Sequence, residues 1–114
     1  MPRRTSRSFD ENAVRKAQEN LVNGLDATRL ADMFYILSDP SRTRIGCILT
    51  DELCVNDVCA AIGLSRYAIA RHLSLMRDAG ILTSRKEGTR VFYRLANPKL
   101  SAWIKMGVTL LPSM

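Results

Sequence analysis

Apolar residues between positions 56 and 77 recur with the spacing of two short helices. Each segment keeps its apolar residues on one side, and together these are Val58, Ile62, Ile69, Leu73 and Met76. Gly63-Leu64-Ser65 separates the segments, where glycine accepts a positive φ and serine favours the N-cap of a helix. The pattern therefore predicts a helix-turn-helix whose second helix begins near Arg66.

Beyond Arg77 the period of the apolar positions changes from helical to two. Gly80 is placed to end the second helix, and the segments 81–86 and 90–95 then flank Glu87-Gly88-Thr89. Two alternating segments around a glycine-containing loop predict a β-hairpin. A hairpin directly after a helix-turn-helix is a wing, so the predicted fold class is mainly α with a small β-hairpin, a winged helix-turn-helix.

The two ends of the chain predict further helices. Residues 9–37 are helical in pattern, with an interruption at Gly24-Leu25-Asp26 and Asp26 as the cap of the second piece. Asp39-Pro40 and Asn97-Pro98 each place a capping residue before a proline, which favours a helix start. The last helix, 99–111, is apolar on more than one side and predicts a subunit interface. We expect residues 1–10 to form a disordered basic arm and residues 11–114 one domain with dimerising terminal helices.

The 114 residues have a net charge of +6, and its distribution is uneven. Residues 9–64 hold five basic and nine acidic residues, whereas residues 65–94 hold seven basic and two acidic ones. This local surplus is typical of proteins that bind nucleic acid, although a solvated basic face is the simpler alternative. The predicted DNA-binding residues are Ser65, Arg66, Tyr67, Ala70, Arg71, His72, Ser74, Arg85, Lys86 and Arg90.

Other function classes find little support. No apolar run reaches membrane-spanning length and no secretory signal is evident, so we expect a cytoplasmic protein without membrane partners. Its three cysteines are then free thiols, ligands or packing residues, not a disulfide framework. An enzyme would need an activated nucleophile beside a base, and the chain has one histidine and no CxxC, so we expect none. A winged-helix module that binds another protein stays open.

Four segments in order resemble the ArsR/SmtB family of bacterial winged-helix repressors: SDPSRTRI (38–45), ELCVNDVCAAIGLS (52–65), ARHLSLMRDAGIL (70–82) and KEGTRVFYRL (86–95). The resemblance implies a homodimer formed by the first and last helices. It also implies that recognition helices bind an inverted-repeat operator in double-stranded DNA, and that an inducer releases them.

Arsenite-responsive members of that family have Cys-Val-Cys-Asp-Leu-Cys where this chain has Cys54-Val55-Asn56-Asp57-Val58-Cys59. Thiolates favour soft ions, so a site for As(III) or Sb(III) as inducer would use Cys54 and Cys59, with Cys47 as a third ligand if its helix approaches. No cofactor is otherwise required. Alternatively, Cys59 only packs and Asn56 caps a helix, or a thiol-redox inducer such as peroxide or persulfide acts on Cys47, alone or together with Cys54. The zinc-type site of the family is excluded, because the last helix has no His, Asp or Glu.

Overall fold

The computed structural model describes residues 8–113, which form two compact units, one through Ala31 and one from Asp32. Residues 1–7, most of the predicted basic arm, lie outside the described part. The first unit contains α1 (Glu11–Glu19), which begins where the Asp10 carboxylate accepts the backbone N–H groups of Asn12 and Ala13. Among residues 8–113, no helix combines the length and apolar content that a membrane crossing requires.

Helix α2 (Gly24–Ile36) begins two residues before its predicted cap, Asp26. The Asn23 side chain accepts the backbone N–H of Asp26 at 2.8 Å and donates to the Asp26 carboxylate at 3.0 Å. The cap is therefore Asn23. The prediction of Asp26 was wrong, because Asp26 lies inside the first turn of α2, where its own backbone N–H is one of the groups that the cap satisfies. The non-helical residues between α1 and α2 are residues 20–23, directly before Gly24.

The corner between α2 and α3 (Pro40–Ile48) is the predicted one, with Asp39 as N-cap and Pro40 in the first turn. The backbone N–H of Arg42 is the main cause that lowers the pKa of the Asp39 carboxyl. The Arg42 side chain donates from Nε to the carbonyl oxygen of Ile36 at 2.6 Å, and the Thr43 hydroxyl donates to that of Leu37 at 2.6 Å. These bonds hold the end of α2 against the start of α3.

The helix-turn-helix consists of α4 (Val55–Ile62) and α5 (Arg66–Asp78). Gly63 adopts φ of 82° between them, and the Ser65 hydroxyl accepts the backbone N–H of Ala68, both as predicted. The start of α4 differs from the prediction, because Cys54 is its N-cap and Asn56 lies inside the first turn. Asparagine at this position therefore does not cap the helix.

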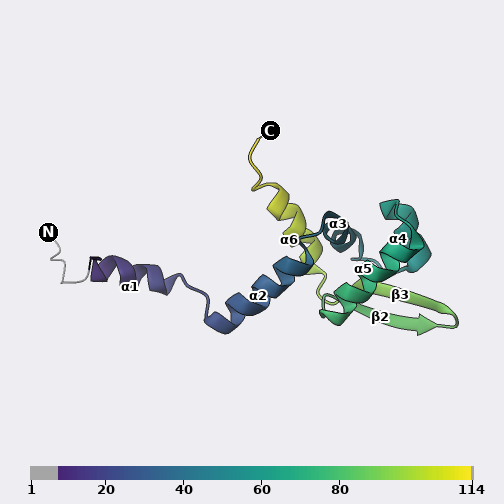
Figure 1. Ribbon diagram of the computed structural model, residues 1–114, viewed down its shortest axis with the longest axis horizontal. Helices are drawn as coiled ribbons and strands as arrows, with labels where there is room; N and C mark the ends of the chain where they lie inside the picture. The colour runs from purple at the N-terminus through teal and green to yellow at the C-terminus, as the bar shows by residue number, and fades with distance from the viewer. Residues whose placement is uncertain (1–7, 114) are drawn as a thin grey trace. The chain divides into compact units, whose positions relative to one another are not determined.

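The chain also forms a three-stranded antiparallel sheet in the order β1-β3-β2. Figure 1 shows the hairpin of β2 and β3. The wing is β2 (Leu82–Glu87) and β3 (Arg90–Leu95), and Glu87 belongs to its strand instead of the turn. Sequence analysis had missed β1 (Leu53–Cys54), which pairs with β3 so that Cys54 lies opposite Phe92. A two-residue strand has too short a pattern to be recognised by its alternation.

The core lies where α3, α4, α5 and the sheet meet. Its fully buried side chains are those of Ile45, Leu49, Val58, Ile69, Leu73 and Met76, which include the predicted stripe of α5. The last helix, α6 (Lys99–Val108), packs against α3 and ends three residues before the predicted end. It buries only Ser101 and Ile104, whereas α2 buries no residue.

Candidate nucleic-acid interface and sensor thiols

The outer face of α5 carries the residues predicted to meet DNA bases. Tyr67 is 75% exposed, and Ala70 and Arg71 are exposed beside it. The Arg71 guanidinium carbon lies 6.0 Å from the centroid of the Tyr67 ring, at the outer limit of a cation–π contact. The opposite stripe of this helix is fully buried, so the exposed face is presented in one fixed orientation.

Four other predicted residues of this helix form hydrogen bonds within the chain. Ser65 caps α5, and the Arg66 guanidinium donates to the Asn56 side chain. His72 is partly buried, with its Nδ1 atom 3.3 Å from Nη1 of Arg42, so this nitrogen acts as an acceptor. The Ser74 hydroxyl accepts from Arg77 at 3.4 Å. Tyr67, Ala70 and Arg71 are left as the residues with the freest access to a groove.

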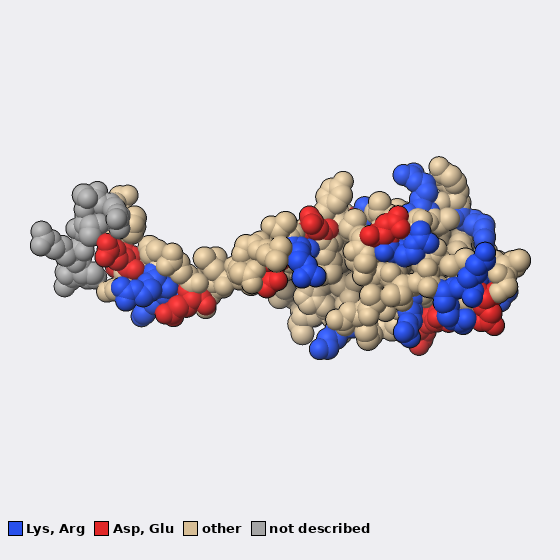
Figure 2. Space-filling view, turned by 90° about the horizontal axis from the view of Figure 1, so that it is seen from below, with Lys and Arg blue, Asp and Glu red and all other residues tan. Residues whose placement is uncertain are grey.

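The wing places Arg85, Lys86 and Arg90 on its two strands, and all three are exposed. Figure 2 shows Lys and Arg side chains gathered over the hairpin end of the second unit, with carboxylates among them. Arg85 is engaged with Glu52 and Glu87, whereas no salt bridge within residues 8–113 involves Lys86 or Arg90. The two unpaired cations are the better candidates for phosphate contacts.

Cys54 is a buried thiol at the junction of β1 and α4. Its Sγ donates to Oδ2 of Asp57 at 3.1 Å, and its backbone N–H donates to the same oxygen at 3.3 Å. The thiol's hydrogen bond is the largest cause of a lowered pKa at the Asp57 carboxyl, followed by the backbone bond and, at longer range, the charge of Arg90. The carboxylate of Asp57 thus bonds both donors of Cys54.

The other two cysteines are free thiols that are partly buried. Cys59 packs against the core from α4, and Cys47 lies on α3, where its carbonyl oxygen accepts the Ser101 hydroxyl at 2.9 Å. Within the described residues, no group of three His, Cys, Asp or Glu side chains is arranged to hold a metal ion. The structure therefore does not bring Cys47, Cys54 and Cys59 together as one set of ligands.

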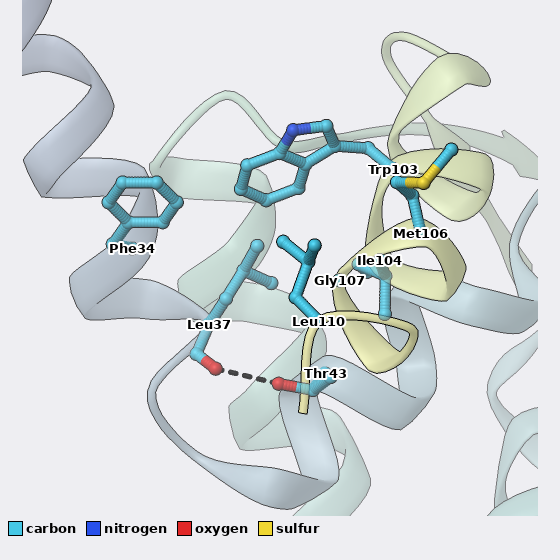
Figure 3. A pocket seen from close by; sticks show the side chains of 8 residues that line it. All are labelled: Phe34, Leu37, Thr43, Trp103, Ile104, Met106, Gly107 and Leu110. Carbon is cyan, nitrogen blue, oxygen red and sulfur yellow. Dashed lines mark hydrogen bonds between the residues drawn. The ribbon is translucent and has the colours of Figure 1, made fainter. Parts of the chain in front are cut away.

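A hollow of about 290 Å³ lies between α2, α3 and α6. Figure 3 shows its lining, in which Phe34 and Trp103 stand side by side; their rings stack with centroids 5.4 Å apart. The other lining residues are Leu37, Thr43, Ile104, Met106, Gly107 and Leu110. The hollow is apolar, as expected of a surface that a further protein surface covers.

Three residues of this region were not predicted from the sequence. Asp57 follows Cys54 at the spacing of a capping box, a signal that could have identified it had cysteine been considered as a cap. Glu52 bonds Arg85, which lies 33 residues away in the chain, and Arg42 bonds His72, which lies 30 residues away. No local sequence pattern predicts pairs at such separations.

Residues 39–84 match the model of the family described as bacterial regulatory protein, arsR family. A cadmium resistance transcriptional regulatory protein, CadC of Listeria innocua, is 33% identical over 100 residues, which are 86% of this chain and 83% of that protein. The chain belongs to the arsR family. The arsenical resistance operon repressor of Escherichia coli is 45% identical over 73 residues, 62% of each chain. The matched region thus spans less than two thirds of that relative's length.

Solved structures of regulators share the fold. The transcriptional repressor BigR from Xylella fastidiosa superposes with a TM-score of 0.71 and 25% identity, over 88% of this chain and 98% of that one. The antimony-specific transcriptional repressor AntR superposes with a TM-score of 0.67 and 25% identity, over 80% of this chain and 84% of that one. The winged helix-turn-helix predicted from the sequence is confirmed.

Proposed function

We propose that this arsR-family chain is a homodimeric transcriptional repressor that binds double-stranded DNA and is released by a thiol-reactive inducer. The observation that supports it best is the α5 face of Tyr67, Ala70 and Arg71, fixed by a buried stripe and flanked by the basic wing. A helix of this kind fits the major groove, where Arg and polar groups distinguish base edges.

The dimer would form through α2 and α6. Their exposed side chains include Phe34, Tyr35, Trp103, Met106 and Val108, which are large and apolar. A second copy would cover this surface and set two α5 helices in successive major grooves, as an inverted-repeat operator requires.

The proposed inducer is arsenite or antimonite, acting at Cys54. Two observations support it: the arsenical resistance repressor and the antimony-specific repressor are similar to this chain, and the Cys54 thiol lies beside the wing. A thiol-redox inducer is the second candidate, because all three cysteines are free and no three-ligand group occurs among the described residues.

Fluorescence anisotropy of the reduced protein on DNA from upstream of its own gene tests both parts. Arg71→Ala should weaken specific binding by about 1–3 kcal/mol, whereas Arg77→Ala, which removes the same charge from the last turn of α5, should change it far less. Equal losses in the two variants would contradict a base-reading role for Arg71.

The inducer is tested by titrating arsenite, antimonite, cadmium, zinc, peroxide and polysulfide separately into that complex. Release by arsenite that is lost in Cys54→Ser and kept in Cys47→Ser would support a metalloid sensor. Release by peroxide or polysulfide alone, lost in Cys47→Ser, would instead identify a redox sensor. A protein that binds no upstream fragment would not be a repressor of its own gene, and a protein partner would become the alternative.

A further inference from the structure

One side of the three-stranded sheet brings the wing and the segment before α4 together. Arg85 lies opposite Phe92, and Phe92 lies opposite Cys54. Residues directly opposite one another in a sheet point to the same face, so these three side chains form one row from β2 across β3 to β1. Glu52 lies two residues before Cys54, and its carboxylate reaches the same face, where it accepts a hydrogen bond from Arg85.

The Arg85 guanidinium uses all of its nitrogens along this row. Its Nε and Nη2 atoms lie 2.7 and 2.6 Å from Oε1 of Glu52, and Nη1 lies 2.6 Å from Oε2 of Glu87. Its carbon also lies 4.7 Å above the centroid of the Phe92 ring. A single exposed ion pair stabilises little, but charge-assisted bonds to two carboxylates combined with stacking on a ring define one geometry.

The electrostatics of the cluster agree with this geometry. The side-chain bond from Arg85 is the main cause that lowers the pKa of the Glu52 carboxyl, and the bond to Glu52 is the main cause that raises the pKa of Arg85. With both carboxylates ionised, the cluster has one positive and two negative charges. It therefore offers no free positive charge to a phosphate, unlike the neighbouring Lys86.

We propose that Arg85 is a positioning residue, which clamps the wing across β3 onto Glu52, and that it is not one of the phosphate contacts. The inference rests on the proposed DNA-binding function and refines it: Lys86 and Arg90 neutralise phosphates, while Arg85 keeps the hairpin aligned with α5. The clamp also ties the wing to the segment that ends at Cys54.

The test is the salt dependence of DNA affinity for Arg85→Gln, Glu52→Gln, the double variant and Lys86→Gln as the matched control. We expect Arg85→Gln and Glu52→Gln each to weaken binding several-fold with the wild-type salt slope. The double variant should be no weaker than either single one, because both remove the same clamp. Lys86→Gln should reduce the slope by about one, as loss of a phosphate contact does.

Glu52→Gln distinguishes a positioning role of Arg85 from a phosphate contact, because the two roles predict opposite changes in DNA affinity. If Arg85 were a phosphate contact held back by Glu52, removing that carboxylate would tighten binding, and Arg85→Gln would reduce the salt slope by about one. Either result would overturn the proposal, and so would an Arg85→Gln variant that binds DNA like the wild type.

A second measurement does not depend on DNA. Amide hydrogen exchange of the free protein should be faster at the β1–β3 and β2–β3 pairs in Arg85→Gln and Glu52→Gln than in the wild type or Lys86→Gln. If the wild type binds no DNA but this difference is seen, the proposed function fails and the clamp stands. Exchange in Arg85→Gln equal to that of Lys86→Gln would refute the clamp itself.

Discussion

The helix-turn-helix and the terminal helices of this chain differ in how far their apolar side chains are buried. Ile69, Leu73 and Met76 of α5 are fully buried by elements of the same chain, whereas Phe34 of α2 and Trp103 of α6 are 47% and 44% exposed. The first region is complete within one chain. The second leaves large apolar side chains exposed, and under the proposed function a second copy of the chain covers them.

Leu73→Ala should have the largest effect, because it opens a cavity in the buried core beneath α5. We expect it to lower the free energy of unfolding by about 3 kcal/mol, measured by urea denaturation. Leu75→Ala removes the same atoms from the exposed side of α5 and should cost less than about 1 kcal/mol. Similar losses for the two leucines would mean that α5 does not have one buried and one open face.

Trp103→Ala should act on assembly. A large aromatic side chain at the centre of an interface contributes about 2 kcal/mol or more, so the dissociation constant of the dimer should rise roughly 30-fold. Sedimentation equilibrium measures it, with Tyr67→Ala as the control, since Tyr67 is also an exposed aromatic residue but lies on α5. If the tryptophan variant dimerises like the wild type, α6 is not the interface.

Acid should lower the stability of the segment from the start of α3 to the first turn of α4, by the smallest of the three effects. Asp39, Glu52 and Asp57 all have lowered pKa values in the folded chain, because hydrogen bonds and nearby cations favour their ionised forms. Their contribution is present above the pKa of the unfolded chain and is lost as the pH falls through the folded pKa. Asp39→Asn should therefore flatten the dependence of stability on pH below about 4.

Denaturation at a series of pH values measures this slope. Asp32→Asn, which removes a carboxylate from α2, is the control for the change of charge. If both variants change the pH dependence of the free energy of unfolding equally in acid, the Asp39 cap is not a source of the loss of stability at low pH.

The same contrast describes what could be predicted from the sequence. Gly63, Ser65 and the stripe of α5 act through neighbours within one or two turns, so local spacing was enough to place them. Asn23 instead of Asp26 as a cap shows the limit of this reasoning, because two good capping residues three positions apart compete and only geometry decides.

Contacts between segments far apart in the chain could not be predicted from local sequence spacing. The bond from Arg85 to Glu52 joins residues 33 positions apart. Arg85 was predicted to contact DNA, but in the structure its guanidinium is already paired with this carboxylate. The pairing of Cys54 with Phe92 likewise depends on a strand of two residues. The helices and strands of the proposed interface could therefore be predicted from the sequence, whereas the partners of its side chains could not.

The hydrogen bond between the Cys54 thiol and Asp57 has a consequence for the conditions under which an inducer would act. Under the proposed function, arsenite binds as the neutral As(OH)3: an As–S bond forms at Cys54, an As–O bond breaks, and the thiol proton leaves with the displaced hydroxide as water, so Asp57 loses the S–H donor whose hydrogen bond it now accepts. A divalent cation such as Cd²⁺ would instead release that proton to the solvent, and mass action would make its affinity rise with pH. The pH dependence of release from DNA would therefore distinguish a metalloid hydroxide, whose affinity should change little near neutral pH, from a divalent metal ion.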